Sequence, residues 1–177
     1  MAIGFKKVTG SLTLGGYDSS RFTPNDLTFN FANDVSRDLV VGIQSIKFFD
    51  SDTQDKDLLP SGGILSFIDS TVPQIWLPLD SCKAFEEAFG ITYDERTELY
   101  LVNDSLHDSL IRQDASVSFI LGNEVEGGST INITLPYAAF DMTVGPPIVN
   151  TSQPYFPLRR AANDSQYTLG RTFLQES

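Results

Sequence analysis

One carboxylate, that of Asp69, lies at a position where a charged side chain is unusual and must be stabilised by its surroundings. It directly follows the apolar run 64–68, which comes after two glycines and has the length and composition of a buried strand. An unpaired carboxylate at the end of such a strand would cost several kcal/mol. Asp69 is therefore expected either to be hydrogen-bonded within a turn or to lie in a cleft where it does chemistry.

The other residues exclude most alternative catalytic groups. Cys82 is the only cysteine and His107 the only histidine, so an intramolecular disulfide cannot form and a cysteine-based zinc site lacks ligands. Cys82 lies on the apolar face of an expected helix and His107 in a polar segment, which disfavours a Cys–His pair and a Ser–His–Asp triad. Calcium binding by the acidic segment 50–57 stays open, although that segment lacks EF-hand spacing. We therefore expect carboxylate chemistry, with no metal site and no cofactor.

The composition indicates one acidic globular domain. The chain has 177 residues, of which 41% are hydrophobic and 20% charged, enough for one sizeable core. Its 12 basic and 23 acidic residues give a net charge of −11, and no basic patch is visible. Nucleic acids and anionic membranes bind clustered lysines and arginines, so neither is an expected partner.

Four asparagines lie in Asn-x-Ser/Thr sequons, where chance alone would give roughly one or two. This number favours an extracellular glycoprotein, either secreted or on the cell surface. The chain carries no signal peptide and no apolar run long enough to span a membrane. We expect the targeting segment of the parent protein to lie outside this chain. The four asparagines are Asn103, Asn132, Asn150 and Asn163.

The spacing of apolar and turn residues predicts a mostly β fold, either barrel-like or sandwich-like. The clearest helix is expected at 79–90, with Asp80 or Ser81 as its cap and Gly90 as its end. A helical turn is expected near 105–112. Strands are expected at 11–14, 27–31, 39–43, 46–49, 64–68, 100–102, 117–121 and 131–135.

Three segments, in order, resemble the C-terminal lobe of pepsin-like aspartic proteases. Phe67-Ile68-Asp69-Ser70-Thr71 is similar to the second catalytic loop of that family. Residues 11–18 resemble its early strand ending in Gly-Gly-x-Asp, and residues 167–174 resemble its late hydrophobic-hydrophobic-Gly segment with the short helix after it. The glycine in the late segment, Gly170, would let two backbones approach closely. The nearest likeness is to the divergent, glycosylated fungal members.

The resemblance implies a single lobe, with closed-barrel-like sheets and one or two short helices. Residues 1–177 would be the C-terminal lobe, truncated at both ends. Asp69 would be one of two aspartates that activate water for peptide hydrolysis, and Ser70 would support its loop. Thr71, Ile75 and Trp76 would line the substrate cleft, although a core position is the simpler expectation for Trp76. The expected partners are the N-terminal lobe of the same parent and a peptide substrate, and the isolated lobe is expected to be inactive.

Two departures from the family pattern leave the activity open. The family has glycine at the position of Thr71, and serine or threonine at that of Val72, whose side chain has no donor. Losing a hydrogen bond to a charged group is worth roughly 1.5–3 kcal/mol, enough to raise the pKa of Asp69 or misplace its carboxylate. The alternatives are an active endopeptidase, a non-catalytic pepsin-like binding or scaffolding module, and an unrelated β domain. The last is favoured if no psi-shaped loop at Asp69 is crossed by residues 169–170.

Overall fold

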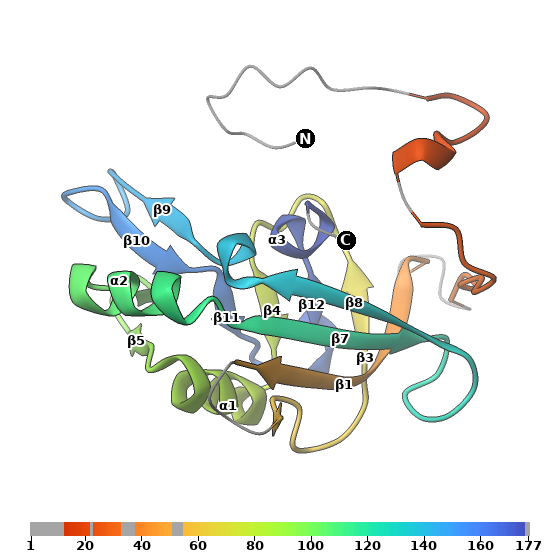
Figure 1. The fold of residues 1–177 in the computed structure, drawn as a ribbon, viewed down its shortest axis with the longest axis horizontal. Coiled ribbons are helices and arrows are strands. Elements are labelled where there is room, and N and C mark those ends of the chain that lie inside the picture. Colours follow the sequence, from red (N-terminus) through yellow and green to blue (C-terminus); the bar gives the residue numbers. More distant parts are fainter. Residues whose placement is uncertain (1–12, 22, 33–37, 51–54, 176–177) are drawn as a thin grey trace.

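The structure is a computed structural model that describes residues 13–21, 23–32, 38–50 and 55–175 (Figure 1). It is mostly β, as the sequence predicts, with three α-helices and three short 3-10 helices in the described part. The helices are α1 (Leu79–Phe89), α2 (Asp104–Gln113), α3 (Arg171–Leu174), η1 (Ser19–Arg21), η3 (Tyr137–Ala139) and η4 (Asp164–Gln166). The strands are β1 (Val40–Phe49), β2 (Lys56–Asp57), β3 (Ile64–Ile68), β4 (Ile75–Leu77), β5 (Thr92–Asp94), β6 (Leu99–Leu101), β7 (Ser116–Gly122), β8 (Thr130–Pro136), β9 (Met142–Val144), β10 (Gln153–Phe156), β11 (Leu158–Arg160) and β12 (Thr168–Leu169).

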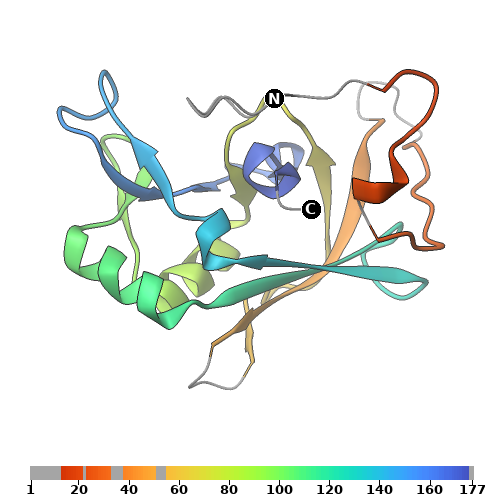
Figure 2. The same cartoon turned by 45° about the horizontal axis from the view of Figure 1, so that its top comes forward.

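The larger sheet has eight strands in the order β11-β4-β12-β3-β1-β7-β8, with β2 added to β1. β12 pairs in parallel with β3 and antiparallel with β4, so a strand from late in the chain lies between two early ones. The sheet is strongly curved (Figure 2). It stays open among the described strands, because β8 and β11 are the two ends of its order and do not pair with each other. The barrel-like closure expected for the sheets is therefore not seen.

The smaller sheet is fully antiparallel, with the order β5-β6-β10-β9. It lies at one end of the molecule beside α2 (Figure 1). The helical turn expected near 105–112 is the full helix α2. Asn103 caps it, because its side-chain oxygen accepts the backbone N–H of Leu106 at 3.0 Å.

An aromatic core joins the two sheets to α1. Phe85 and Phe89 lie on the buried face of α1, and Phe156 of β10 packs against Phe89 at 4.8 Å and against Phe140 at 4.9 Å between ring centroids. Burying each of these rings stabilises the fold by roughly 1.5–3 kcal/mol. The helix predicted at 79–90 is thus confirmed, and Gly90 ends it in a left-handed conformation, with a φ of 67°.

The predicted cap of α1 is wrong. Its N-cap is Pro78, which makes no side-chain capping bond. The carboxylate of Asp80 instead accepts the neighbouring N–H of Ser81 at 2.9 Å. Asp80 already lies inside the first turn of the helix, two residues after the N-cap, so its side chain does not have the place of a capping side chain.

The early segment differs most from the expected pattern. Of the strand predicted at 11–14, residues 11 and 12 lie outside the described residues, and Thr13 and Leu14 are irregular, with Leu14 85% exposed. Residues 27–31 are also irregular, and Phe31 is 77% exposed. No described strand pairs with either stretch, and an alternating pattern makes a strand only when a partner takes up its backbone hydrogen bonds.

Candidate functional site

Asp69 follows directly on the last residue of β3 and lies beside β12. The two strands are parallel, with Thr168 opposite Phe67 and Leu169 opposite Ile68. The backbone N–H of Asp69 donates to the carbonyl of Leu169 at 3.2 Å. A segment from near the other end of the chain therefore fixes the backbone that carries this carboxylate.

The loop after Asp69 leads to β4, which pairs with the opposite side of β12 (Figure 1). β12 thus lies between the two arms of the loop, which is the psi-shaped crossing that the sequence led us to look for. Gly170 lies against this loop: a Cβ added there would be 2.3 Å from the carbonyl oxygen of Gln74 and 2.4 Å from that of Val72. Only a glycine lets the two backbones approach so closely.

The first residues of α3 hold the far part of the loop. Figure 2 shows this helix between the two arms formed by β3 and β4. The backbone N–H of Arg171 donates to the carbonyl of Val72 at 2.8 Å. The carbonyl of Pro73 accepts both the N–H of Thr172 at 3.2 Å and its hydroxyl at 2.9 Å. Consecutive carbonyls of the loop are therefore satisfied by one short helix.

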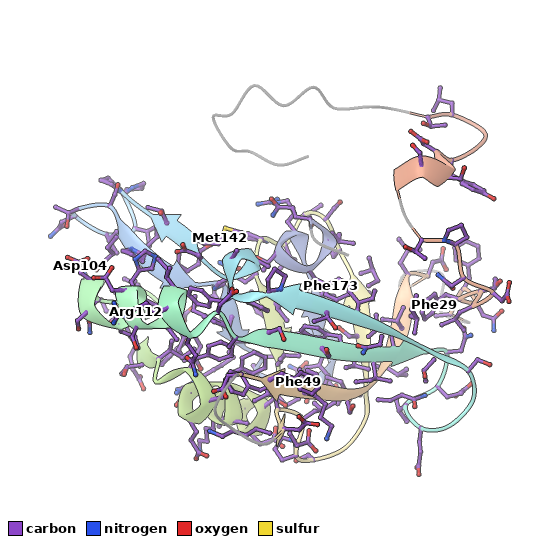
Figure 3. All side chains as sticks on the ribbon, viewed as in Figure 1. Phe29, Phe49, Asp104, Arg112, Met142 and Phe173 are labelled. Atoms are coloured by element: carbon purple, nitrogen blue, oxygen red, sulfur yellow. The ribbon has the colours of Figure 1, made fainter. Side chains whose placement is uncertain are left out.

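Phe173 anchors that helix in the core (Figure 3). Its side chain is 2% exposed, and its ring meets the ring of Phe119 on β7 edge-on at 5.3 Å. Aromatic pairs of this geometry add about 0.5–1.5 kcal/mol to the burial of the rings. The short helix of the crossing is therefore anchored on β7 of the large sheet.

The carboxylate of Asp69 is held by Thr71. Both the backbone N–H and the hydroxyl of Thr71 donate to Oδ1 of Asp69, each at 2.7 Å. These bonds lower the pKa of Asp69, the hydroxyl contributing most and the N–H next, against a small opposing effect of burial. The expectation that Val72 raises this pKa is wrong, because Thr71 supplies the missing hydroxyl. A threonine two residues after an aspartate is a known turn signature, and it could have been read from the sequence.

The other expected site residues are placed less favourably. Ser70 is exposed; its carbonyl accepts a bond from Arg171 at 3.2 Å, and its hydroxyl has no hydrogen-bond partner in the described part of the chain. Ile75 is 2% exposed and belongs to the hydrophobic core, so the expectation that it lines a cleft is not met. Trp76 points to the other side of β4; it is half-buried, with the guanidinium of Arg159 over its ring at 4.7 Å.

An apolar hollow of about 180 Å³ is lined on one side by Ile68, the last residue of β3. The sequence did not indicate this hollow, because the alternating pattern that includes Phe29 and Phe31 predicts a strand there. Asn123 holds this segment through its side chain: Nδ2 donates to the carbonyl of Thr28 at 2.9 Å, and Oδ1 accepts the N–H of Asn30 at 2.8 Å. In Figure 3, Phe29 lies at the end of the molecule opposite α2, which carries the labelled residues Asp104 and Arg112. The apolar side chains that line the hollow are Phe29, Phe31, Leu39, Val40, Val41 and Ile68.

Cys82 and His107 were considered for a Cys–His pair and a Ser–His–Asp triad, and each has its own surroundings in the structure. Cys82 is fully buried, and burial raises the pKa of its thiol to about 12, so the reactive thiolate does not form near neutral pH. His107 is partly exposed, and its Nε2 lies 2.8 Å from Oδ1 of Asp141. This pair joins α2 to the chain just after η3.

The described residues contain no group of three His, Cys, Asp or Glu side chains that could hold a metal ion. They also include no helix with the length and apolar character needed to cross a membrane. Of the acidic segment 50–57, residues 51–54 lie outside the described part, so calcium binding there is not tested.

All four sequon asparagines are exposed. Asn103 and Asn163 each accept the hydroxyl of the serine two residues on, at 2.7 Å and 2.5 Å. Asn132 lies in β8, and Asn150 lies in the loop between β9 and β10. The side chains therefore meet the steric requirement for carrying a glycan.

Comparison with known proteins gives a structural likeness only. No protein-family model matches the sequence, and no curated protein matches it. Among solved structures, the chain is similar to the aspartic proteinase from Irpex lacteus, with a TM-score of 0.54 and 15% sequence identity. The match covers 91% of this chain and 45% of that one, so the chain spans less than half the length of this structural relative. Together with the crossing at Asp69, this likeness shows that the chain has a pepsin-like fold.

Proposed function

We propose that this chain is one lobe of a two-lobed aspartic endopeptidase, with Asp69 as one of its two catalytic carboxylates. The observation that carries the proposal is the position of Asp69 at the start of a loop crossed by β12 and Gly170. A simple turn would satisfy the carboxylate without bringing in a distant strand. The structural likeness to an aspartic proteinase supports the same assignment.

The chemistry that the proposal requires needs two carboxylates that share one proton, because like charges a few ångströms apart do not both ionise easily. Asp69 is suited to be the ionised member, since Thr71 lowers its pKa. Both donors of Thr71 bind Oδ1, which leaves Oδ2 as the oxygen with the greater affinity for a proton. Asp69 would therefore take a proton from the attacking water through Oδ2.

The second carboxylate would come from an N-terminal lobe of the same parent, which is the first proposed partner. The second is a peptide substrate, and the apolar hollow lined by Ile68, the residue before Asp69, would accept an apolar side chain. This part of the proposal also makes the isolated chain inactive, since one carboxylate cannot share a proton with itself.

We also propose a secreted or cell-surface location for the parent protein. The support is the four exposed sequons. In a secreting host, treatment with a peptide glycosidase should increase the electrophoretic mobility of the protein. Unchanged mobility, with all four asparagines unmodified by mass spectrometry, would contradict the proposal.

The enzyme assignment is tested by Asp69→Asn in the two-lobed protein that it requires. The variant keeps the size and most hydrogen bonds of the side chain but cannot take up the proton. We expect peptidase activity at acidic pH to fall roughly 10²–10⁴-fold. Activity that stays at the wild-type level would exclude Asp69 as a catalytic group.

A non-catalytic pepsin-like binding or scaffolding module is the second candidate. It is favoured by Thr71 and Val72, which replace the residues that the resemblance leads us to expect. If this candidate is right, the two-lobed wild type is inactive, and the double variant Thr71→Gly, Val72→Thr creates or raises peptidase activity. A fully active wild type would exclude it.

A further inference from the structure

We propose that Arg171 is a positioning residue, which sets the Asp69 carboxylate through the peptide group between Ser70 and Thr71. The proposal rests on the proposed function only for what the carboxylate does; the positioning itself concerns this chain alone. Arg171 comes directly after the glycine of the crossing, so the chain path places its backbone against the loop, and its guanidinium reaches the same loop.

The guanidinium of Arg171 donates to two neighbouring carbonyls of the loop. Its Nη1 lies 3.2 Å from the carbonyl oxygen of Ser70 and 3.3 Å from that of Thr71. The backbone N–H of the same residue binds the next carbonyl, that of Val72, at 2.8 Å. A single residue therefore holds three consecutive carbonyls, two of them with a charged donor, which makes stronger hydrogen bonds than a neutral one.

The carbonyl of Ser70 and the N–H of Thr71 belong to one planar peptide group. When Arg171 fixes the oxygen of that group, it also fixes the direction of its N–H, which donates to Oδ1 of Asp69 at 2.7 Å. A donor on the oxygen also polarises the peptide and strengthens its N–H as a donor, by an amount put at roughly 10–30% per bond. Arg171 thus acts on the carboxylate through one rigid, polarised unit.

A second aspartate turn serves as an internal comparison. At Asp94, the N–H of Thr97 lies 3.2 Å and the N–H of Arg96 3.4 Å from the carboxylate. Among the described side chains, no arginine or lysine donates to the carbonyls of that turn. The backbone bond to the carboxylate is therefore shorter where the arginine holds the peptide.

The charge of Arg171 also acts on a titratable group of a neighbouring strand, the hydroxyl of Tyr155 on β10. Burial raises the pKa of Tyr155, and Arg171 lowers it. α3 itself carries no acidic residue. An effect of Arg171 on the pKa of Asp69 can therefore be separated from a general change of charge by following Tyr155 as well.

The test is an NMR titration of the chain itself, following the side-chain carboxyl carbon of Asp69 and the backbone amide of Thr71. Arg171→Met removes the charge and the side-chain donors; Arg171→Lys keeps the charge and replaces the guanidinium by a single ammonium group. We expect Arg171→Met to raise the pKa of Asp69 toward its ordinary value and to move the Thr71 amide resonance upfield, with Arg171→Lys in between. Arg112→Met, on the exposed face of α2, is the matched control and should change neither.

If Arg171→Met folds and leaves both the pKa of Asp69 and the amide resonance of Thr71 unchanged, the proposal is overturned. If that variant does not fold, Arg171→Lys decides alone: a partial shift in the same direction supports positioning, and wild-type values overturn it. In the two-lobed protein, Arg171→Met should lower kcat roughly tenfold and leave KM unchanged, as expected for the loss of one supporting hydrogen bond. If the proposed function is wrong, Asp69→Asn is without effect on activity, while the NMR result on Arg171 still stands.

Discussion

Two aspartate turns in this chain have nearly the same local chemistry. Oδ1 of Asp69 accepts the hydroxyl of Thr71 at 2.7 Å, and Oδ2 of Asp94 accepts the hydroxyl of Thr97 at 2.5 Å. In each case a backbone N–H of the same threonine adds a second bond. The threonine hydroxyl is the largest cause of the lowered pKa at both aspartates.

The two turns differ in what surrounds them. Asp94 ends β5 and turns directly into β6, with Asp94 opposite Leu99 in the pairing of the hairpin. The Asp69 loop is instead crossed by β12, pressed against Gly170 and held by the carbonyl bonds of Arg171. The Asp94 turn needs only its own neighbours, whereas the Asp69 loop needs a segment from near the end of the chain.

A hydrogen-bonded aspartate with a lowered pKa is therefore not by itself a sign of a functional site. Local residues produce it wherever a threonine follows at the right spacing. What distinguishes Asp69 is the close approach of two distant backbones, which costs conformational freedom and requires a glycine. Substitutions at Gly170 and at the two threonines separate the effects of the local bonds from those of the crossing.

The largest effect on stability is expected from Gly170→Ala. The added methyl group would lie 2.3 Å and 2.4 Å from two carbonyl oxygens of the loop, so the crossing must shift, at a cost of about 3 kcal/mol. Urea unfolding of the chain measures it. Gly16→Ala is the matched control, since nothing lies within 4 Å of its added Cβ. Equal stability of the two variants would mean that the crossing does not exist in solution.

A smaller effect is expected from removing one hydroxyl at each turn, with Thr71→Val and Thr97→Val. The pKa of Asp69 should rise in the first and that of Asp94 in the second, because each loses the largest cause of its lowered value. NMR titration of the two carboxyl carbons measures both. A shift at only one of the two would break the local equivalence of the turns.

The pH dependence of stability gives the smallest effect. A folded-state pKa below the ordinary value of 3.8 means that ionised Asp69 stabilises the fold above that pH, and that this contribution is lost as the pH falls through the lowered pKa. Thr71→Val should therefore lose stability relative to wild type at neutral pH and approach it in strong acid. A difference that grows in acid would have the wrong sign for this account.

The sequence predicted the parts of the fold that local patterns determine. The helix α1 and the hairpin of β7 and β8 follow from apolar spacing and from the glycines near their ends. The strand expected at 27–31 failed because its alternating pattern has no partner strand among the described residues. The pairing of β12 between β3 and β4 came only from the resemblance, since periodicity says nothing about which strands meet.

The place of Asp69 at the end of β3 was predicted from the sequence, but the hydrogen bonds around it were not. Asp69 was singled out because an apolar strand ends in a carboxylate. The sequence comparison predicted that the Asp69 carboxylate lacks a hydroxyl donor, because Val72 replaces a serine or threonine of the family pattern. It did not take into account that Thr71, one position earlier, can donate its hydroxyl instead. The contribution of Arg171 could not be read from the sequence at all, since it depends on the close approach that Gly170 permits.

The central claim is that the crossing, and not the local hydrogen bonds, makes Asp69 the reacting carboxylate. The most direct test compares Asp69→Asn with Asp94→Asn in the two-lobed protein that the proposal requires, by peptide hydrolysis at acidic pH. The account predicts that Asp69→Asn lowers kcat roughly 10²–10⁴-fold, while Asp94→Asn leaves it at the wild-type level. Equal activity of the two variants, whether both active or both inactive, would contradict the account.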